Sequence, residues 1–259
     1  MRLAVFSSAT PGWSAGRVVA AAQALGVSAV EWGAGPGQAL TRRDDARRAA
    51  ELCAPLRLRC SGLSVQDRGA TLAQPARATR YLALAAELGA PHIRLFPPRY
   101  DGGLARAQDR ARAAVDRLVE RAAPDGLRVL VENAPGTIAP SPQLVLELVA
   151  HHDPDRVGVL YDPGNTVLEG HVAPSLALEQ LGGYLAHVHL KNVAWRRQAG
   201  AWELGYTSLR GGILDVPAVL AALRRARYRG HVAVDHLRGR PTLAELRLEL
   251  RYLGGLLQA

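Results

Sequence analysis

The sequence predicts a single-domain α/β protein, a (β/α)8 TIM barrel spanning residues 1–259, on three observations. Short apolar runs alternate with Ala-, Leu- and Arg-rich helical patterns along the whole chain, and no low-complexity linker interrupts them. Eight such pairs fit into the 259 residues, a number and a length typical of this barrel. No glycine-rich phosphate-binding loop follows the first strand, which argues against the competing doubly wound sheet.

The predicted strands are short runs rich in Val, Leu, Ile and Ala. They cover residues 3–6, 28–32, 56–61, 92–96, 128–132, 157–162, 186–191 and 231–235. The helical patterns cover residues 14–25, 42–53, 75–88, 104–122, 142–151, 173–182, 216–227 and 242–257. Four of these patterns begin at a hydroxyl residue that can accept a hydrogen bond from the first helical turn. These candidate N-caps are Ser14, Thr41, Ser141 and Thr242.

Composition excludes several other classes of protein. With 48% hydrophobic and 21% charged residues, the chain can bury a sizeable core and is not disordered. Its longest uncharged runs, residues 3–16 and 18–30, are shorter than the roughly 20 apolar residues of a membrane helix. The first residues lack the apolar core of a signal peptide, so we expect a cytoplasmic protein with no membrane partner.

The net charge of +9 raises the question of a polyanionic partner. The basic residues are 31 Arg and one Lys, and the arginines are scattered over helical segments without interleaved aromatic residues. That distribution is typical of solvated helix faces rather than of a nucleic-acid groove. We therefore expect a small-molecule substrate and no nucleic-acid partner, and a homo-oligomer stays open.

Strand periodicity predicts which polar side chains enter the barrel. Side chains alternate along a strand, and TIM-barrel active sites lie where the strands end. Because Val129 and Val131 face the helices, Glu132 points inward at the end of the fifth strand. The same alternation turns inward Glu31, Arg94, Asp162, His187, His189, Lys191 and Asp235. Six strands thus bring a charged or imidazole group to one mouth, which packing alone does not require.

Four of these side chains form a candidate metal site. Glu132, Asp162, His189 and Asp235 come from strands five to eight, so they converge on one point. Three carboxylates and one imidazole suit Mn²⁺, Mg²⁺ or Co²⁺, with Zn²⁺ as an alternative. Any one carboxylate could instead cap a helix or pair with an arginine, but four on successive strands favour one divalent metal ion.

Lys191 is informative for an independent reason. In a chain with 31 arginines, the one lysine lies two residues beyond the proposed metal histidine. Lysine is a compact charge whose pKa responds to burial, which arginine cannot offer. A functional role follows, either binding an anionic or carbonyl oxygen or moving a proton.

At these residues the sequence resembles the xylose-isomerase-like TIM barrels, the broad sugar phosphate isomerase/epimerase family. The resemblance covers nearly the whole chain and rests on Val131-Glu132-Asn133, Tyr161-Asp162-Pro163-Gly164-Asn165, His187-Val188-His189-Leu190-Lys191-Asn192 and Tyr228-Arg229-Gly230. It implies metal ligands at Glu132, Asp162, His189 and Asp235. Four positions depart from the family's usual pattern. Asp235 stands where Glu is common, Asn192 where Asp is common, Arg210 where Gly is common, and Asn165 where some members have His.

The resemblance implies a metal-dependent isomerase or epimerase acting on a small sugar, a polyol-derived ketone or a related hydroxy-carbonyl compound through an enediolate. Glu132 is the expected base, Asp235 or a water returns the proton, and Lys191 holds a substrate oxygen. The expected substrate contacts are Glu31, Arg94, His187, Asn165 and Arg210. The loop 193–212, which contains two tryptophans, is expected to shape the pocket.

Other functions stay open on the same scaffold. A dehydratase would eliminate water from the same enediolate. A non-catalytic ligand-binding barrel would be consistent with the shortened ligand at Asp235, and an apurinic endonuclease-like barrel with the net charge.

Overall fold

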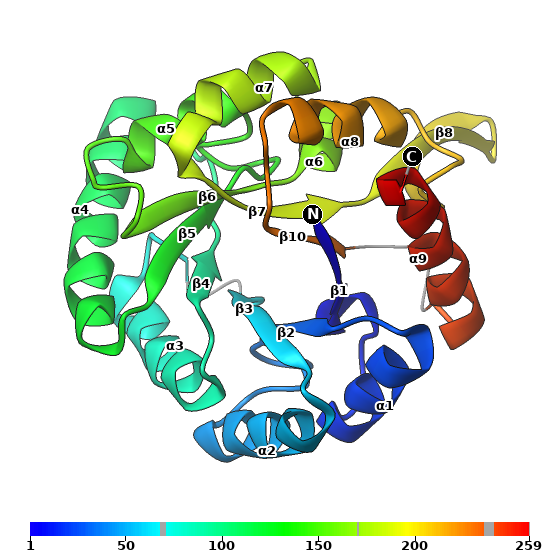
Figure 1. Ribbon diagram of the computed structural model, residues 1–259. Coiled ribbons are helices and arrows are strands. Elements are labelled where there is room, and N and C mark those ends of the chain that lie inside the picture. Colours follow the sequence, from blue (N-terminus) through cyan, green and yellow to red (C-terminus); the bar gives the residue numbers. More distant parts are fainter. Residues whose placement is uncertain (68–70, 170, 236–240, 259) are drawn as a thin grey trace.

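The computed structural model describes residues 1–67, 71–169, 171–235 and 241–258, and it confirms the predicted barrel (Figure 1). Eight parallel strands close in the order β1-β10-β7-β6-β5-β4-β3-β2, and helices surround them. The barrel strands are β1 (Arg2–Phe6), β2 (Ala29–Ala34), β3 (Arg59–Val65), β4 (His92–Leu95), β5 (Arg128–Glu132), β6 (Val157–Tyr161), β7 (Leu185–Leu190) and β10 (His231–Val234).

The helices follow the predicted order with one addition. They are α1 (Ala15–Leu25), α2 (Arg43–Cys53), α3 (Pro75–Leu88), α4 (Leu104–Ala122), α5 (Pro142–Val149), α6 (Pro163–Leu168), α7 (Pro174–Leu181), α8 (Val216–Arg225) and α9 (Leu243–Gln258). The short helix α6 was not predicted, and it begins immediately after the candidate ligand Asp162. Short 3-10 turns are η1 (Ser7–Ala9), η2 (Ala54–Leu56), η3 (Ala123–Asp125) and η4 (Gly182–Tyr184). No described helix is both long and apolar enough to cross a bilayer.

The predicted strand periodicity agrees with the observed core. Val129, Val131, Val159 and Val188 are buried in the large apolar cluster between strands and helices. Their sequence neighbours therefore point into the barrel, because side chains alternate along a strand. There the apolar cluster is small, consisting of Ala4, Phe6, Ala29 and Ala233. Leu130 and Leu160 are also buried at inward positions, and the next inward residues toward the carboxyl ends of β5 and β6 are Glu132 and Asp162.

Three of the four predicted helix caps are confirmed. The hydroxyls of Ser14, Ser141 and Thr242 accept hydrogen bonds from the first turns of α1, α5 and α9. The prediction for Thr41 is wrong, because the N-cap of α2 is Arg42. Thr41 instead donates its own N–H and hydroxyl to the Asp45 carboxylate.

The third strand was predicted too early in the chain. Residues 54–56 form the turn η2 directly after α2, and Arg57 takes a left-handed conformation at φ 52°. The strand begins at Arg59 and continues through Gly62 and Ser64, residues that weakened its sequence signal. Packing explains the glycine at position 62, since a Cβ there would lie 2.0 Å from Nε2 of His92.

The predicted loop after β7 is largely an antiparallel β-hairpin. Strand β8 (Asn192–Gln198) pairs with β9 (Ala201–Thr207) in a separate two-stranded sheet at the rim (Figure 1). Asn192 anchors its base, donating to the carbonyls of Leu209 and Leu214 and accepting from the Leu214 N–H. Gly212 lets this junction close, because a Cβ there would lie 2.1 Å from the Asn192 Oδ1.

Candidate active site

The four candidate metal ligands meet at the carboxyl end of the barrel. Glu132 ends β5, Asp162 follows β6, His189 lies in β7 and Asp235 follows β10. All four are buried, and one ligand atom from each lies within 4.8 Å of the others. This separation is short enough for a single ion to contact all four after small side-chain adjustments.

The donor atoms of this group fit a divalent cation. Glu132 Oε2 and Asp162 Oδ2 are buried and are paired with Arg94 Nε at 3.0 Å and with Lys191 Nζ at 2.6 Å, whereas the buried His189 Nδ1 makes no hydrogen bond within the described structure. Buried polar atoms in native proteins are nearly always satisfied, so His189 Nδ1 beside three carboxylates indicates a place where a cation fits. His189 Nδ1 lies 3.8 Å from Asp235 Oδ1, which completes the set. Carboxylate oxygens and one imidazole nitrogen are the donors expected of Mn²⁺, Mg²⁺ or Co²⁺.

Glu31 lies beneath the candidate ligands and is hydrogen-bonded to His189, the one histidine among them. Its fully buried carboxylate is hydrogen-bonded to Nε2 of His187 at 2.8 Å and to Nε2 of His189 at 2.8 Å. Burial by itself raises the pKa of Glu31, but the two histidines more than offset this and hold that pKa well below its usual value. The bond to Nε2 orients His189 so that Nδ1 faces the other ligands, as metal-binding histidines commonly require.

The same contact changes the titration of His189. Burial lowers its pKa, but the charge and hydrogen bonds of Glu31, with Asp235 and Glu132, raise the pKa to about 9. Without a bound cation His189 is therefore protonated at neutral pH, and a metal ion would replace that proton.

Glu132 is held in place by two neighbours. Arg94 Nε lies 3.0 Å from Glu132 Oε2, and Asn165 Nδ2 donates to Glu132 Oε1 at 3.1 Å. Burial raises the pKa of Glu132, and the nearby Arg94 and His189 limit the increase. A carboxylate whose pKa is moved upward is better matched to proton abstraction near neutral pH.

Arg94 also links Glu132 to Glu31. Ser64 on β3 donates its hydroxyl to Glu31 and accepts a hydrogen bond from Arg94 Nε at 3.2 Å. The guanidinium additionally donates to the Val65 carbonyl and lies 4.1 Å from the ring centre of Phe96. With these four groups around it, Arg94 is fixed and acts as a support for Glu132.

Lys191 bridges two of the candidate ligands. Its Nζ lies 2.6 Å from Asp162 Oδ2 and 2.8 Å from Asp235 Oδ2. Burial alone lowers the pKa of Lys191, but Asp162 and Asp235 more than offset this and raise that pKa. Lys191 was expected to have a pKa that responds to burial, and the two carboxylates outweigh that effect. A permanently protonated ammonium favours oxygen binding over proton transfer.

A network of amides joins β5 to β6 at the site. Asn133 Nδ2 donates to the Asp162 carbonyl, and its Oδ1 accepts from the Asp162 N–H, at 2.9 and 2.8 Å. Asp162 Oδ1 caps α6 by accepting from the Asn165 N–H, which leaves only Oδ2 for a cation or Lys191. Asn133 belonged to the quoted motif but was not predicted as a site residue.

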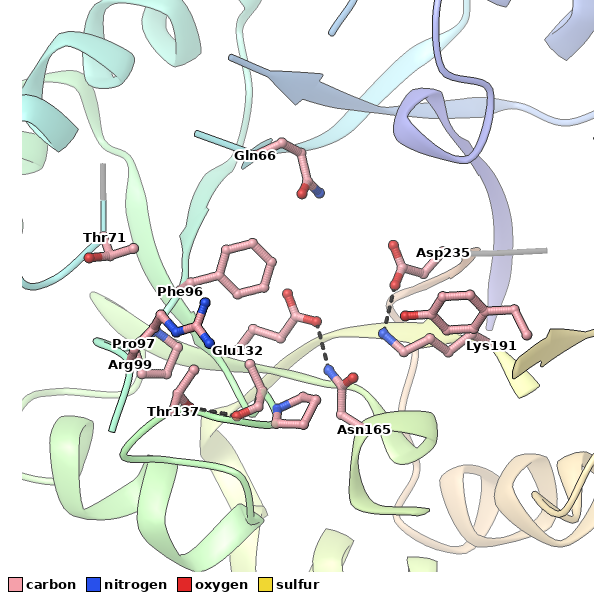
Figure 2. Close-up of a pocket in the computed structure, with 13 residues that line it drawn as sticks. Gln66, Thr71, Phe96, Pro97, Arg99, Glu132, Thr137, Asn165, Lys191 and Asp235 are labelled. Carbon is pink, nitrogen blue, oxygen red and sulfur yellow. Dashed lines mark hydrogen bonds and ion pairs between the residues drawn. The ribbon is translucent and has the colours of Figure 1, made fainter. Parts of the chain in front are cut away.

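A cavity of about 180 Å³ opens over the ligand group (Figure 2). Its lining residues are Gln66, Thr71, Phe96, Pro97, Arg99, Glu132, Ala134, Pro135, Thr137, Asn165, Lys191, Tyr206 and Asp235. Sequence reasoning missed Gln66, Arg99 and Tyr206. Arg99 and Gln66 follow barrel strands and thus carry a positional signal, whereas Tyr206 becomes a wall residue only through the hairpin.

Of the five predicted substrate contacts, the structure brings only Asn165 to the cavity wall. Glu31, Arg94 and His187 are buried, do not line the cavity and contact protein side chains, so their described contacts are those of groups that position other side chains. Arg210 is directed elsewhere: it lies 4.7 Å from the ring centre of Tyr252 in α9 and donates to the Leu248 carbonyl. Cation–π stacking on this partly buried ring holds the Arg210 side chain away from the barrel mouth.

The fold and this ligand group define a class of protein, and sequence comparison names it. The family described as xylose isomerase-like TIM barrel matches residues 19–254. The chain therefore belongs to that family.

The individual proteins that this chain resembles share little sequence identity with it. Inosose dehydratase of Lacticaseibacillus casei is 24% identical over 138 residues, which cover 49% of this chain and 46% of that protein. The chain thus spans less than half the length of the curated relative it matches. D-allulose 3-epimerase from Methylomonas sp. superposes with a TM-score of 0.79 at 15% identity, covering 99% of this chain and 98% of that one. A xylose isomerase-like TIM barrel protein from Mycobacterium smegmatis in complex with magnesium gives 0.74 at 16% identity, covering 99% and 96%.

Proposed function

We propose that the protein is a divalent-metal-dependent isomerase or epimerase acting on a small sugar or related hydroxy-carbonyl compound through an enediolate. The observation that carries the proposal is the convergence of four buried ligand groups, Glu132, Asp162, His189 and Asp235, whose ligand atoms lie within 4.8 Å of one another under a cavity. The solved relatives with the same fold include enzymes named as sugar 3-epimerases, which supports this class of reaction.

Each candidate residue has a separate proposed role in the reaction. Glu132, Asp162, His189 and Asp235 would hold the ion, which supplies positive charge beside the substrate's carbonyl and adjacent hydroxyl oxygens. Glu132, which lines the cavity, removes the α-proton, and Arg94 and Asn165 keep its carboxylate oriented. Asp235 returns the proton from another wall of the cavity. Lys191 donates a hydrogen bond to a substrate oxygen on which negative charge develops.

A dehydratase is the second candidate. The curated relative is named inosose dehydratase, and elimination of water starts from the same enediolate. Lys191 is protonated and lies at the cavity wall, where it could assist a departing hydroxyl group. Product analysis separates the two reactions, since an epimer keeps the substrate's mass and a dehydration product loses one water.

Metal content tests the proposal against its rivals. We expect the purified protein, loaded with Mn²⁺ and freed of excess ion by gel filtration, to retain one equivalent by elemental analysis. The same sample should exchange substrate α-protons for deuterium in D₂O. Three equivalents would instead support the endonuclease-like alternative, and no retained metal would support a ligand-binding barrel. A cytoplasmic location and a homo-oligomer stay predictions from the sequence.

The Asp235→Glu variant tests the shortened ligand. In this chain the Asp235 carboxylate is drawn to Lys191 at 2.8 Å and stays 3.8 Å from His189 Nδ1. One more methylene lets the carboxylate reach the other ligands, so we expect metal affinity to increase about ten-fold, the value of one charge-assisted contact. Isothermal titration with Mn²⁺ measures this, and Asp215→Glu, at the N-cap of α8, is a matched control. Equal or weaker binding than the parent would show that Asp235 is not a ligand.

A further inference from the structure

The charged side chains that line the cavity do not all have a partner of opposite charge within the described residues. Glu132 is 3.0 Å from Arg94, and Lys191 is 2.8 Å from Asp235. The fourth charged lining residue, Arg99, forms no ion pair within the described ranges, and no residue outside those ranges is Asp or Glu. Arg99 is therefore a cation that faces the cavity without a carboxylate of its own.

A divalent ion would leave Arg99 as the charge without a balance. The described interior carries four carboxylates, Glu31, Glu132, Asp162 and Asp235, against Arg94, Lys191 and a protonated His189. A doubly charged ion that replaces the His189 proton balances this set, and Arg99, which is exposed at the rim of the cavity, then adds one positive charge. A ligand with one negative charge would balance it.

Arg99 lies on a braced rim. It forms an isolated antiparallel bridge with Thr137, and the neighbouring pairs Tyr100 N–H to Gly136 O and Ile138 N–H to Pro98 O are 3.1 and 3.0 Å long. Its side chain lies beside Phe96 and Thr137, across the cavity from Lys191 and Asp235 (Figure 2). A substrate whose reacting carbons lie near Glu132, Lys191 and Asp235 can therefore present its other end to Arg99.

The chemistry of this rim suits one planar anion. Pro97, Pro98 and Pro135 have no N–H to offer, and the Thr137 hydroxyl already donates to the Ala134 carbonyl. Gln66 and Thr71 add neutral polar groups to the lining, so the guanidinium is the charged donor at this end of the described cavity, and its planar fork matches a carboxylate through two parallel hydrogen bonds. A phosphate group would favour additional backbone N–H groups or a helix N-terminus, as its usual sites provide.

We propose that the substrate is an acid, a hydroxy-carbonyl compound whose carboxylate binds Arg99 at the end remote from Lys191 and Asp235. This inference rests on the proposed function and narrows it. It also separates the chain from its solved relatives, because the D-allulose and L-ribulose in their names are neutral sugars.

Three probes that share the same ketone end test the proposal. D-fructose, D-fructuronate and D-fructose 6-phosphate differ only at the terminal carbon remote from the ketone, which carries a hydroxyl, a carboxylate and a phosphate, respectively. Calorimetry on the Mn²⁺-loaded protein measures binding, and deuterium incorporation measures α-proton exchange. We expect D-fructuronate to bind at least about ten-fold more tightly than D-fructose, the value of one charge-assisted pair. Arg99→Met should remove that ratio, whereas Arg106→Met, an equal charge change on the exposed side of α4, should preserve it.

The outcomes separate this inference from the proposed function. Failure of the parent to bind D-fructuronate, equal binding of acid and neutral sugar, or an Arg99→Met protein that keeps the ratio would each overturn the assignment of Arg99. Preference for the phosphate would overturn the choice of carboxylate. Tight binding of the acid without α-proton exchange for any probe would support the Arg99 site and contradict the enediolate reaction.

Discussion

The Glu132→Gln variant is expected to fold like the parent and to lose exchange of substrate α-protons with solvent. The substitution keeps the shape of the side chain and removes the charge that both abstracts the proton and binds the cation. A general base contributes about 10²–10⁴-fold to the rate, so exchange should decrease by that factor. NMR detection of deuterium incorporation under saturating metal and substrate measures it, and circular dichroism checks the fold.

Glu120→Gln is the matched control, because Glu120 is exposed on α4 and far from the cavity lining. It makes the same change of charge and should exchange protons at the parental rate. If the Glu132 variant exchanges substrate protons as fast as the parent, Glu132 is not the base. The catalytic assignment would then have to be rebuilt around Lys191, which contacts both Asp162 and Asp235.

The Glu31→Gln variant is expected to lose metal affinity although Glu31 touches neither the cavity nor the candidate ion. A Gln side chain lacks the negative charge and replaces one of the two carboxylate oxygens that lie within 2.9 Å of His189 Nε2 by an NH₂ donor. His189 then loses the contact that orients Nδ1, and removal of such a supporting group costs about 10–100-fold in metal affinity. Titration calorimetry with Mn²⁺ measures the loss independently of activity.

Ser64→Ala provides the comparison for Glu31. It removes a third hydrogen bond to the same carboxylate while leaving both histidine contacts, so metal affinity should change much less. Equal losses in the two variants would show that general destabilisation of the interior, not orientation of His189, determines affinity. Glu31 also links stability to pH: since its pKa lies well below 4.5, its stabilising effect is present above that value and decreases as pH falls through the acid range.

Much of the barrel could be predicted from local patterns. Strands β5, β6, β7 and β10 combine outward valines with inward polar residues, and both the apolar burial and the strand end are local properties. Strand β3 could not be predicted as well, because Gly62 and Ser64 are small interior residues selected by their neighbours. Gly62 leaves room for His92, and Ser64 joins Glu31 to Arg94. Neither requirement is visible within the strand itself.

By itself the sequence determined the barrel, the inward side of each strand and the candidate ligands at the ends of β5, β6, β7 and β10. What only the tertiary structure decided was the depth of each inward group and the direction of each side chain beyond the strands. Alternation assigns a face, but depth depends on the register between neighbouring strands, which shifts between Val30 and Glu31 where β2 meets β3. Glu31 consequently lies beneath His189, while Arg99 and Tyr206 reach the cavity from segments braced by non-local hydrogen bonds.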